Sequence, residues 1–351
     1  MSHNELSKNE CLTLYGLIKY SLLNDKEIAE KVGVKHSTFT AIKVRLRKEN
    51  YYYPVRMPYL QVFDYEMLAV TYAKFLGNLP LEERLQLSKK IQKKYPEVVW
   101  AVSSHTQAIS IQMVKNYTYI KKWNEDIERI YSKHGLLGDE GVTSIMFPFK
   151  LTDINRFFDF SSLLEKTFGL GIHKHERFFG DKKLWKTNLS NIEKRVYYGL
   201  ICHPELSDKE LAQKIFVSRP TIAKIKKRFE GKLLRTVRIV NLEKMCFQML
   251  VFIHLKFKPG VANKNIKNGF IKSFTNSMQP VLLILGTTDC VMLIPFKDFD
   301  EYTKAMSTAV ENYKKYGILK SIPNTLLFSF SELKEIRKHI YASVVKKALG
   351  I

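Results

Sequence analysis

A run of cationic and hydroxyl side chains in residues 207–229 has the spacing of one helical face. The apolar residues Ile222, Ile225 and Phe229 recur at helical intervals and predict a buried face on the same helix. The opposite face carries side chains that can donate hydrogen bonds to phosphate oxygens or base edges, namely Arg219, Thr221, Lys224, Lys227 and Arg228. This combination is typical of nucleic-acid recognition.

Two short helices joined by a tight turn would present that face. Ser207 and Glu210 have the spacing of a capping box at the start of the first helix. Ser218 is a natural N-cap for the second helix, and Pro220 is tolerated in the first turn that follows. The stretch therefore predicts a helix-turn-helix with a basic second helix.

The same pattern occurs earlier in the chain. DKEIAEKVGVKHSTFTAIKVRL (25–46) aligns without a gap with DKELAQKIFVSRPTIAKIKKRF (208–229). Lys35-His36-Ser37 replaces Ser218-Arg219-Pro220, so the two basic helices differ at their starts. Self-similarity of this quality predicts a duplicated unit with two unequal recognition helices.

The repeat continues beyond the helix pairs. A basic, β-prone stretch follows each pair, at 51–63 and 233–242, and predicts a small two-stranded wing in each copy. Strand-like and helical segments then alternate in the order β-α-β-β-α-β, which is typical of a ferredoxin-like sandwich. The predicted fold class is α+β: two winged helix-turn-helix domains, each followed by such a sandwich.

Domain boundaries follow from this repeat. We predict a first winged helix-turn-helix at 1–63, a first ferredoxin-like domain at 64–150, and a partly helical connector at 151–188. A second winged helix-turn-helix follows at 189–243, and a second ferredoxin-like domain occupies 244–351, with a closing helix at 331–349.

Composition restricts the partners. The 351 residues include 57 Lys and Arg against 34 Asp and Glu, a formal net charge of +23 that favours a polyanionic partner. The polar N-terminus and the lack of a long apolar run predict a cytoplasmic protein with no membrane span. The four cysteines form no CxxC pair, and His173 and His175 have no cysteine or carboxylate cluster nearby, so no metal site is expected.

The second copy resembles the Lrp/AsnC (feast/famine) transcription regulators. SDKELAQKIFVSRPTIAKIKKRFEGKLL is similar to that family's helix-turn-helix, and LGTTDCVMLIPFKDFDEY to its strand-turn-strand around the effector cleft. The family's Gly-x-x-Asp turn corresponds to Gly286-Thr287-Thr288-Asp289, whereas the first copy has Ser103-Ser104-His105-Thr106. The resemblance implies DNA binding, pairing through the sandwich sheets as an intramolecular pseudo-dimer, and an amino-acid-like effector near Gly286, Thr288 and Asp289.

The helix-turn-helix pattern predicts which residues contact DNA. Base contacts are expected near the start of each recognition helix, from Arg219, Thr221 and Lys224 and from their counterparts His36, Ser37 and Thr40. Phosphate contacts are expected from other basic or polar residues of the helices and wings, namely Ser218, Lys227, Arg228, Lys43, Arg45, Arg47, Arg56, Arg235 and Arg238.

The sequence thus predicts a double-stranded-DNA-binding transcription regulator that reads two half-sites, without catalytic activity or cofactor. An alternative is an enzyme similar to the siroheme decarboxylases, which share this plan; that function requires histidines and arginines around a tetrapyrrole pocket. The second hairpin has none of these, and the first offers only His105. A protein-interaction module is a third alternative. The operator, the sign of regulation, the effector and a homodimeric state are left open.

Overall fold

The computed structural model describes residues 6–171, 187–260 and 264–351. His173, His175 and the lysines at 182, 183 and 186 lie outside the described residues. None of the described helices is both long and apolar enough to cross a membrane.

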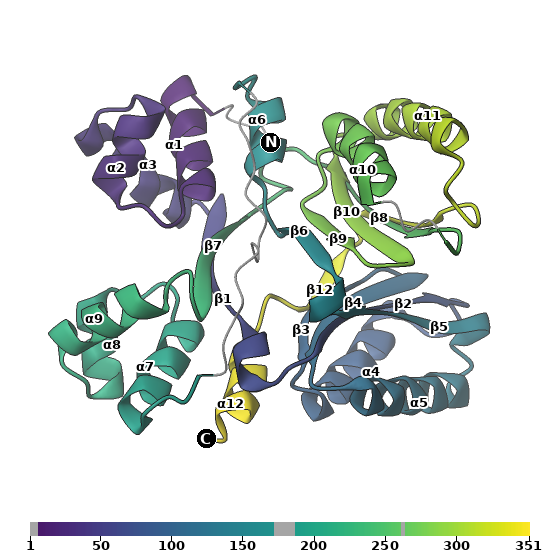
Figure 1. Ribbon diagram of the computed structural model, residues 1–351, viewed down its shortest axis with the longest axis horizontal. Helices are drawn as coiled ribbons and strands as arrows, with labels where there is room; N and C mark the ends of the chain where they lie inside the picture. The colour runs from purple at the N-terminus through teal and green to yellow at the C-terminus, as the bar shows by residue number, and fades with distance from the viewer. Residues whose placement is uncertain (1–5, 172–186, 261–263) are drawn as a thin grey trace.

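Two helix-turn-helix units form one side of the molecule (Figure 1). The first contains α1 (Lys8–Lys19), α2 (Asp25–Val32) and α3 (His36–Lys48), and the second α7 (Asn191–Cys202), α8 (Asp208–Ile215) and α9 (Arg219–Phe229). The predicted caps of the second unit are confirmed: the hydroxyl of Ser207 accepts from Glu210 N at 3.3 Å, and that of Ser218 from Thr221 N at 3.4 Å. Helix α3 begins without a side-chain cap.

The prediction of two separate wings is wrong. Strand β1 (Tyr52–Pro58) of the first half pairs antiparallel with β7 (Leu234–Val240) of the second half, with Val55 opposite Val237. This pairing satisfies backbone groups that two short independent wings would leave exposed along their edges. One ribbon therefore joins the two helix-turn-helix units.

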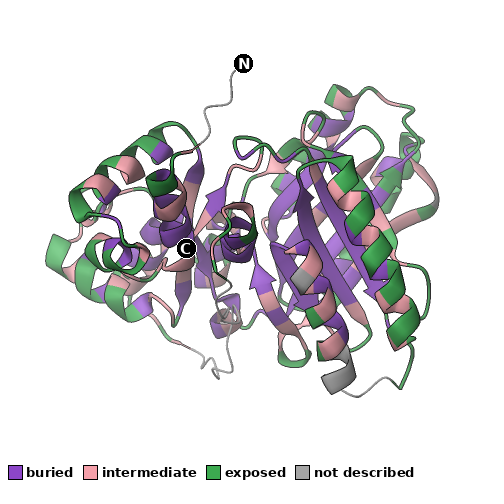
Figure 2. Ribbon diagram, turned by 90° about the horizontal axis from the view of Figure 1, so that it is seen from above, coloured by how far each residue is buried: buried purple, intermediate pink, exposed green. Residues whose placement is uncertain are grey.

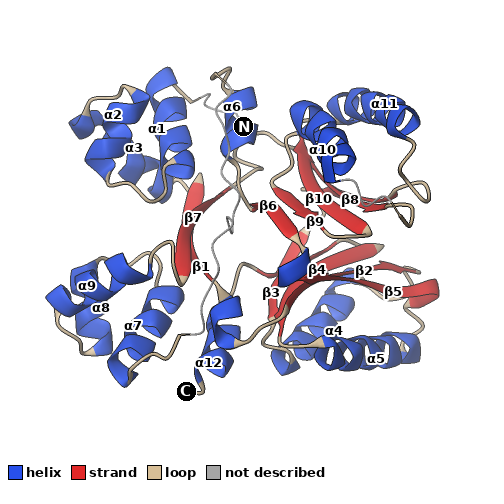
Figure 3. Cartoon of the chain, in the orientation of Figure 1, coloured by secondary structure: helices blue, strands red, loops and turns tan. Residues whose placement is uncertain are grey.

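Each half also contains the predicted βαββαβ sandwich. The first consists of β2 (Met67–Phe75), α4 (Leu81–Lys94), β3 (Val98–Ser103), β4 (Gln107–Val114), α5 (Tyr117–Lys133) and β5 (Leu137–Pro148). The second consists of β8 (Met249–Lys256), α10 (Lys264–Met278), β9 (Leu282–Leu285), β10 (Asp289–Phe296), α11 (Phe299–Tyr316) and β11 (Asn324–Ser329). The two sheets face each other, and the helices cover their outer faces (Figures 1 and 3).

An edge strand crosses from each half into the other half's sheet. Strand β6 (Asp153–Phe157) pairs with β9, and β12 (Lys334–Arg337) pairs with β3, which gives the strand orders β11-β8-β10-β9-β6 and β12-β3-β4-β2-β5. The predicted helix at 331–349 is therefore wrong at its start, because β12 precedes α12 (Ala342–Leu349). The predicted connector contains β6 and a short helix, α6 (Ser161–Thr167).

The main core lies between the facing sheets and continues under the helix-turn-helix units. The rings of Tyr72 on β2 and Phe252 on β8 are 5.3 Å apart, so the two sandwiches contact each other through side chains that alternation places on the inner faces. Figure 2 shows the sheets as buried and the outer helix faces as exposed. The halves form an intramolecular pair related by an approximate twofold axis.

Replacing Gly16 with alanine is expected to lower the free energy of unfolding by roughly 1–3 kcal/mol. A Cβ at Gly16 would lie 2.7 Å from Val32 Cγ1 and 2.8 Å from Ile28 Cγ2, so α1 and α2 would have to move apart. In the matched variant of the second unit, Gly199→Ala, the added Cβ would lie 3.0 Å from its nearest atom, Ile215 Cγ2. The loss of unfolding free energy should therefore be smaller. Urea unfolding of both variants tests this prediction. An equal loss of stability in the two variants, or a larger loss in Gly199→Ala, would contradict the tighter packing at Gly16.

Candidate nucleic-acid interface

Helix α9 presents three cations to solvent along its length, from Arg219 at its start to Lys227 in its last turn. Arg219, Lys224 and Lys227 are exposed and form no ion pair with any described residue. The half-buried Thr221 has its hydroxyl 2.7 Å from that of the capping residue Ser218, so this hydroxyl takes part in the N-terminal cap of α9. The exposed face of α9 therefore keeps its positive charge available for an external anion.

Several other predicted phosphate contacts are already neutralised within the protein. Arg228 contacts Glu193, and Arg45 contacts Glu10. Lys43 Nζ lies 2.7 Å from Asp25, and at the corresponding place in the second unit Lys226 lies 2.8 Å from Asp208. These partly exposed pairs join each recognition helix to a preceding helix, and they reduce the positive charge available to a ligand.

Helix α3 presents a different surface. His36, Ser37 and Thr40 are exposed, and the Thr40 hydroxyl donates to the His36 carbonyl at 3.0 Å. Arg47, near the end of α3, donates to the carbonyl of Glu205 in the second unit at 3.4 Å. The first helix therefore offers mainly uncharged hydrogen-bonding groups at its start and contacts the second unit at its end.

The wing arginines do not lie where a phosphate contact requires them. Arg56 is 4% exposed and donates from Nη1 to the Leu200 carbonyl at 2.9 Å, in the last turn of α7. Arg238 donates to the Leu17 carbonyl in the last turn of α1. Burial lowers the pKa of both arginines, and each guanidinium complements the unpaired carbonyls at a helix C-terminus.

These two contacts are reciprocal. Leu17 and Leu200 occupy the same place in the repeated YGLI, and Arg56 and Arg238 each follow the central Val55–Val237 pair of the ribbon. Each half thus holds the other half's first helix. The third wing arginine, Arg235, is half-buried and lines a small pocket beside Phe157 and Phe158 instead of the space between the helix pairs.

A cleft of about 700 Å³ separates the two helix-turn-helix units, with the ribbon as its floor. Its lining is mixed in charge, with more basic than acidic residues: Lys43, Arg47, Arg56, Lys226, Lys227 and Arg238, together with Glu205, Asp208 and Glu230. The cleft is too small to enclose a duplex, so a DNA surface would be formed by the outer helix starts together with Lys227, which lines the cleft and is exposed.

The predicted effector turn lies at the interface between the sandwiches. One oxygen of Asp289 is 2.7 Å from His254 Nε2, and the Thr288 hydroxyl donates to the other at 2.6 Å. His254 is 2% exposed, and its Nδ1 lies 3.3 Å from the Tyr72 hydroxyl of the first sandwich. A Cβ on Gly286 would approach the Phe147 ring to 3.2 Å. The Asp289 carboxylate is thus engaged with protein groups.

Replacing Asp289 with asparagine is expected to cost roughly 1.5–3 kcal/mol at neutral pH, because it removes hydrogen bonds to a charged acceptor. Burial raises the pKa of Asp289, but the bonds from His254 and Thr288 together lower it below its usual 3.8. The carboxylate therefore contributes stability above that pH, and the contribution is lost as the pH falls below it.

Urea unfolding between pH 3 and pH 7 checks this prediction. The difference in stability between the wild type and Asp289→Asn should shrink on the acid side, whereas Glu332→Gln, at an exposed position, should follow the wild type throughout. A difference that is independent of pH would contradict the assigned role.

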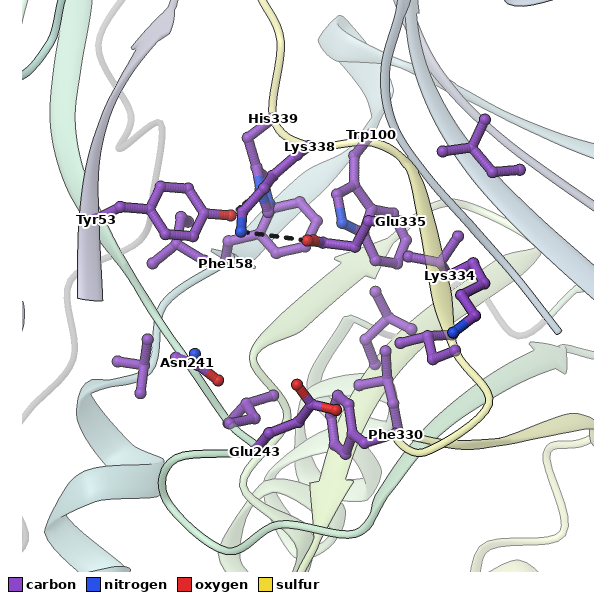
Figure 4. Close-up of a pocket in the computed structure, with 18 of the residues that line it drawn as sticks. Tyr53, Trp100, Phe158, Asn241, Glu243, Phe330, Lys334, Glu335, Lys338 and His339 are labelled. Carbon is purple, nitrogen blue, oxygen red and sulfur yellow. Dashed lines mark hydrogen bonds and ion pairs between the residues drawn. The ribbon is translucent and has the colours of Figure 1, made fainter. Parts of the chain in front are cut away.

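A second cavity, of about 920 Å³, lies between the ribbon and the sandwiches (Figure 4). Its walls include the aromatic residues Trp100, Phe158 and Phe330, and the ring of His339 lies beside Tyr53 at one end. The sequence alone did not predict this cavity or its lining residues. Tyr53 and His339 are 286 residues apart, and only the crossing of β12 into the first sheet brings them together.

The described residues contain no group of three or more His, Cys, Asp or Glu side chains placed to hold a metal ion. In the first sandwich, His105 is exposed at the β3–β4 turn. Arg84 on α4 is 1% exposed and donates to the Ser103 hydroxyl at 2.8 Å, with its guanidinium carbon 4.2 Å from the centroid of the Phe75 ring. Arg84 therefore fastens the turn that lacks the family's Gly and Asp.

Comparison with known proteins places the fold. No protein-family model matches the sequence, and no curated protein sequence matches it. Among solved structures, the siroheme decarboxylase NirDL matches with a TM-score of 0.50 at 11% identity, over 97% of this chain and 98% of that one. The same values apply to NirDL in complex with an iron-uroporphyrin III analogue. The architecture is that of NirDL, with two tandem units that each contain a helix-turn-helix and a βαββαβ sandwich.

Structures of regulators match less than half of the chain. Regulator NMB0573 from Neisseria meningitidis, in complex with L-Met, covers 40% of this chain and 90% of its own, with a TM-score of 0.33 at 14% identity. The AsnC-family protein PF0864 from Pyrococcus furiosus covers 45% and 98%, with a TM-score of 0.31 at 15% identity. Over its full length the chain shares its fold with NirDL.

Proposed function

We propose that this protein binds double-stranded DNA through its two recognition helices and acts as a transcription regulator without catalytic activity. The observation that carries the proposal is the exposed face of α9, where Arg219 at the start, Lys224 in the middle and Lys227 in the last turn form no ion pair with a described residue. The net charge of +23 favours the same partner.

The reciprocal arginines support a fixed spacing between the two helices. Arg56 and Arg238 tie each half to the other half's first helix, and β1 and β7 pair along their length. A rigid pair of unequal helices fits an imperfect palindrome, with one half-site read mainly by arginine and lysine and the other by His36, Ser37 and Thr40.

Selection of bound fragments from random duplex DNA tests this function. We expect enrichment of two dissimilar half-sites at one spacing, because a single chain carries both helices. The half-site read by α9 should be lost from the selection when Arg219 is replaced by alanine. Recovery of random sequence at every salt concentration would contradict sequence-specific binding.

Decarboxylation of a siroheme-like tetrapyrrole is the second candidate, and the whole-chain similarity to NirDL favours it over a regulator on grounds of architecture. The 920 Å³ cavity is the space that could receive such a molecule. Its lining fits a polycarboxylate poorly, because Lys89, Lys334 and Lys338 are balanced by three acids, Glu82, Glu243 and Glu335, and arginine is absent among the described lining residues.

A spectroscopic titration separates the two functions. If the chain binds siroheme in this cavity, mixing the two should shift the Soret band and saturate at one siroheme per chain. If the chain is a regulator alone, siroheme should neither bind stoichiometrically nor lose carboxyl groups, while DNA selection still succeeds.

A further inference from the structure

A buried histidine with an unpartnered nitrogen forms one end of the 920 Å³ cavity. His339 is 7% exposed, and its Nδ1 lies 3.0 Å from the Tyr53 hydroxyl. Its Nε2 is buried and has no hydrogen-bond partner among the described residues. Burial, with a smaller contribution from Lys338, lowers the pKa of His339 to about 3, so the imidazole is neutral. A buried ring nitrogen is costly to leave unpaired, so a ligand that supplies the bond is favoured.

The two halves differ at this place. Phe158 holds the position in the first half that His339 holds in the second: both have a left-handed backbone, with φ of 52° and 47°. In each case the next residue donates its N–H to a sheet carbonyl, to Val281 at 2.9 Å or to Val99 at 2.8 Å. The two rings meet at 88° with their centroids 4.3 Å apart. Histidine therefore replaces phenylalanine on one side of the approximate twofold axis.

The space beside these residues has diverged as well. In the ribbon, Arg235 takes the place of Tyr53, and the pocket that Arg235 lines with Phe157 and Phe158 has only about 20 Å³. The cavity on the His339 side has about 920 Å³, within the range of small-molecule sites. Stability of the fold does not require such an opening, because among the described residues the corresponding place is nearly closed.

The shape and chemistry of the walls indicate what would fill the cavity. The half-buried ring of Phe330 provides an apolar surface, and Trp100 and Phe158, each 4% exposed, add a small accessible area; Figure 4 shows the three around the same space. The rim carries both signs of charge, from Lys89, Lys334, Glu82 and Glu243, and Glu335 pairs with Lys338 at 3.3 Å. Stacking and the histidine nitrogen would therefore select a ligand more strongly than net charge would.

We infer that this cavity binds a planar aromatic small molecule that packs against Phe330 and the accessible part of Trp100 and, once the His339 side chain rotates, forms a hydrogen bond with its buried Nε2. The site is distinct from the predicted effector turn, because it is lined by neither Gly286 nor Asp289. Strands β1 and β7 both contribute to its wall. The inference stands whether or not the protein binds DNA.

Titration of the full chain with 1-anilinonaphthalene-8-sulfonate tests the site, because this probe has fused rings, hydrogen-bonding groups and an emission that rises in apolar surroundings. We expect saturation at one probe per chain, with energy transfer from tryptophan that falls sharply in Trp100→Phe. Leu333→Trp, at a half-buried wall position, should weaken binding at least tenfold. Leu151→Trp, on an exposed residue of the corresponding turn in the first half, should leave binding unchanged.

His339→Phe, which installs the residue of the other half, should weaken binding roughly five- to tenfold by removing the hydrogen bond. Circular dichroism melting identifies any variant that fails to fold, and the energy-transfer comparison needs only the wild type and Trp100→Phe. Binding that is insensitive to both Leu333→Trp and His339→Phe would overturn the inference. So would unsaturable binding, or transfer that is unchanged in Trp100→Phe.

Discussion

Alanine at Arg219, Lys224 and Lys227 together is expected to weaken binding to duplex DNA by roughly 100-fold or more. A base contact from Arg219 or Lys224 contributes about 1–3 kcal/mol, and Lys227, which contacts a phosphate, adds a smaller amount that depends on salt. The three side chains are exposed and form no ion pair with a described residue, so nothing described within the protein competes for them. Fluorescence anisotropy with a labelled selected duplex measures the loss.

A matched control is available on the same helix. Lys226 is one residue from Lys227 but lies 2.8 Å from Asp208, so Lys226→Ala should change DNA affinity only a few-fold. Alanine at His36, Ser37 and Thr40 should alter the sequence of one half-site more than it alters the overall affinity. If Lys226→Ala lowered DNA affinity as much as the triple variant does, the distinction between the paired Lys226 and the exposed Arg219, Lys224 and Lys227 would be wrong.

Arg56→Ala is expected to lower the free energy of unfolding by roughly 2–4 kcal/mol. The substitution leaves a cavity beneath the ribbon and removes the donor that satisfies the Leu200 carbonyl at 2.9 Å. Because Arg56 is 4% exposed, the loss should appear in stability and not as a direct loss of a DNA contact. Urea unfolding measures it.

The comparison with Arg238→Ala sharpens this test. Arg238 makes the corresponding bond to Leu17 but is less completely buried, so its loss should act in the same direction and be somewhat smaller. A phosphate-contacting arginine would behave differently, leaving stability unchanged and reducing the dependence of DNA binding on salt. That result for Arg56→Ala would contradict its placement.

Local patterns predicted the elements that their own residues determine. The capping pairs Ser207–Glu210 and Ser218–Thr221, the inward Ile222 and Phe229, and the βαββαβ order are encoded within short windows. The exposed start of α9 also followed from periodicity, since its apolar residues fix which face turns outward.

Contacts between the halves could not be predicted in the same way. The short β-prone stretch at 52–58 has the composition of a wing whether it pairs locally or with β7, and only the second half decides which. The sequence therefore predicted that Arg56 is an exposed cation that contacts phosphate, although Arg56 is buried against α7. Lys334–Arg337 lies in a helix-like run of charges but forms an edge strand of the other sheet. His339 lies beside the cavity only because β12 crosses into the other sheet, so the sequence alone did not predict it as a site residue.

Binding of duplex DNA by charge and shape together is the central claim, and a salt titration of the wild-type protein with a selected duplex tests it most directly. Each phosphate neutralised should contribute about −0.9 to the slope of log affinity against log salt concentration, so several contacts predict a steep decline. The triple variant at Arg219, Lys224 and Lys227 should show a slope shallower by about one, because Lys227 is the phosphate contact among the three. Absence of duplex binding at low salt, or an affinity that does not change with salt, would contradict the proposal.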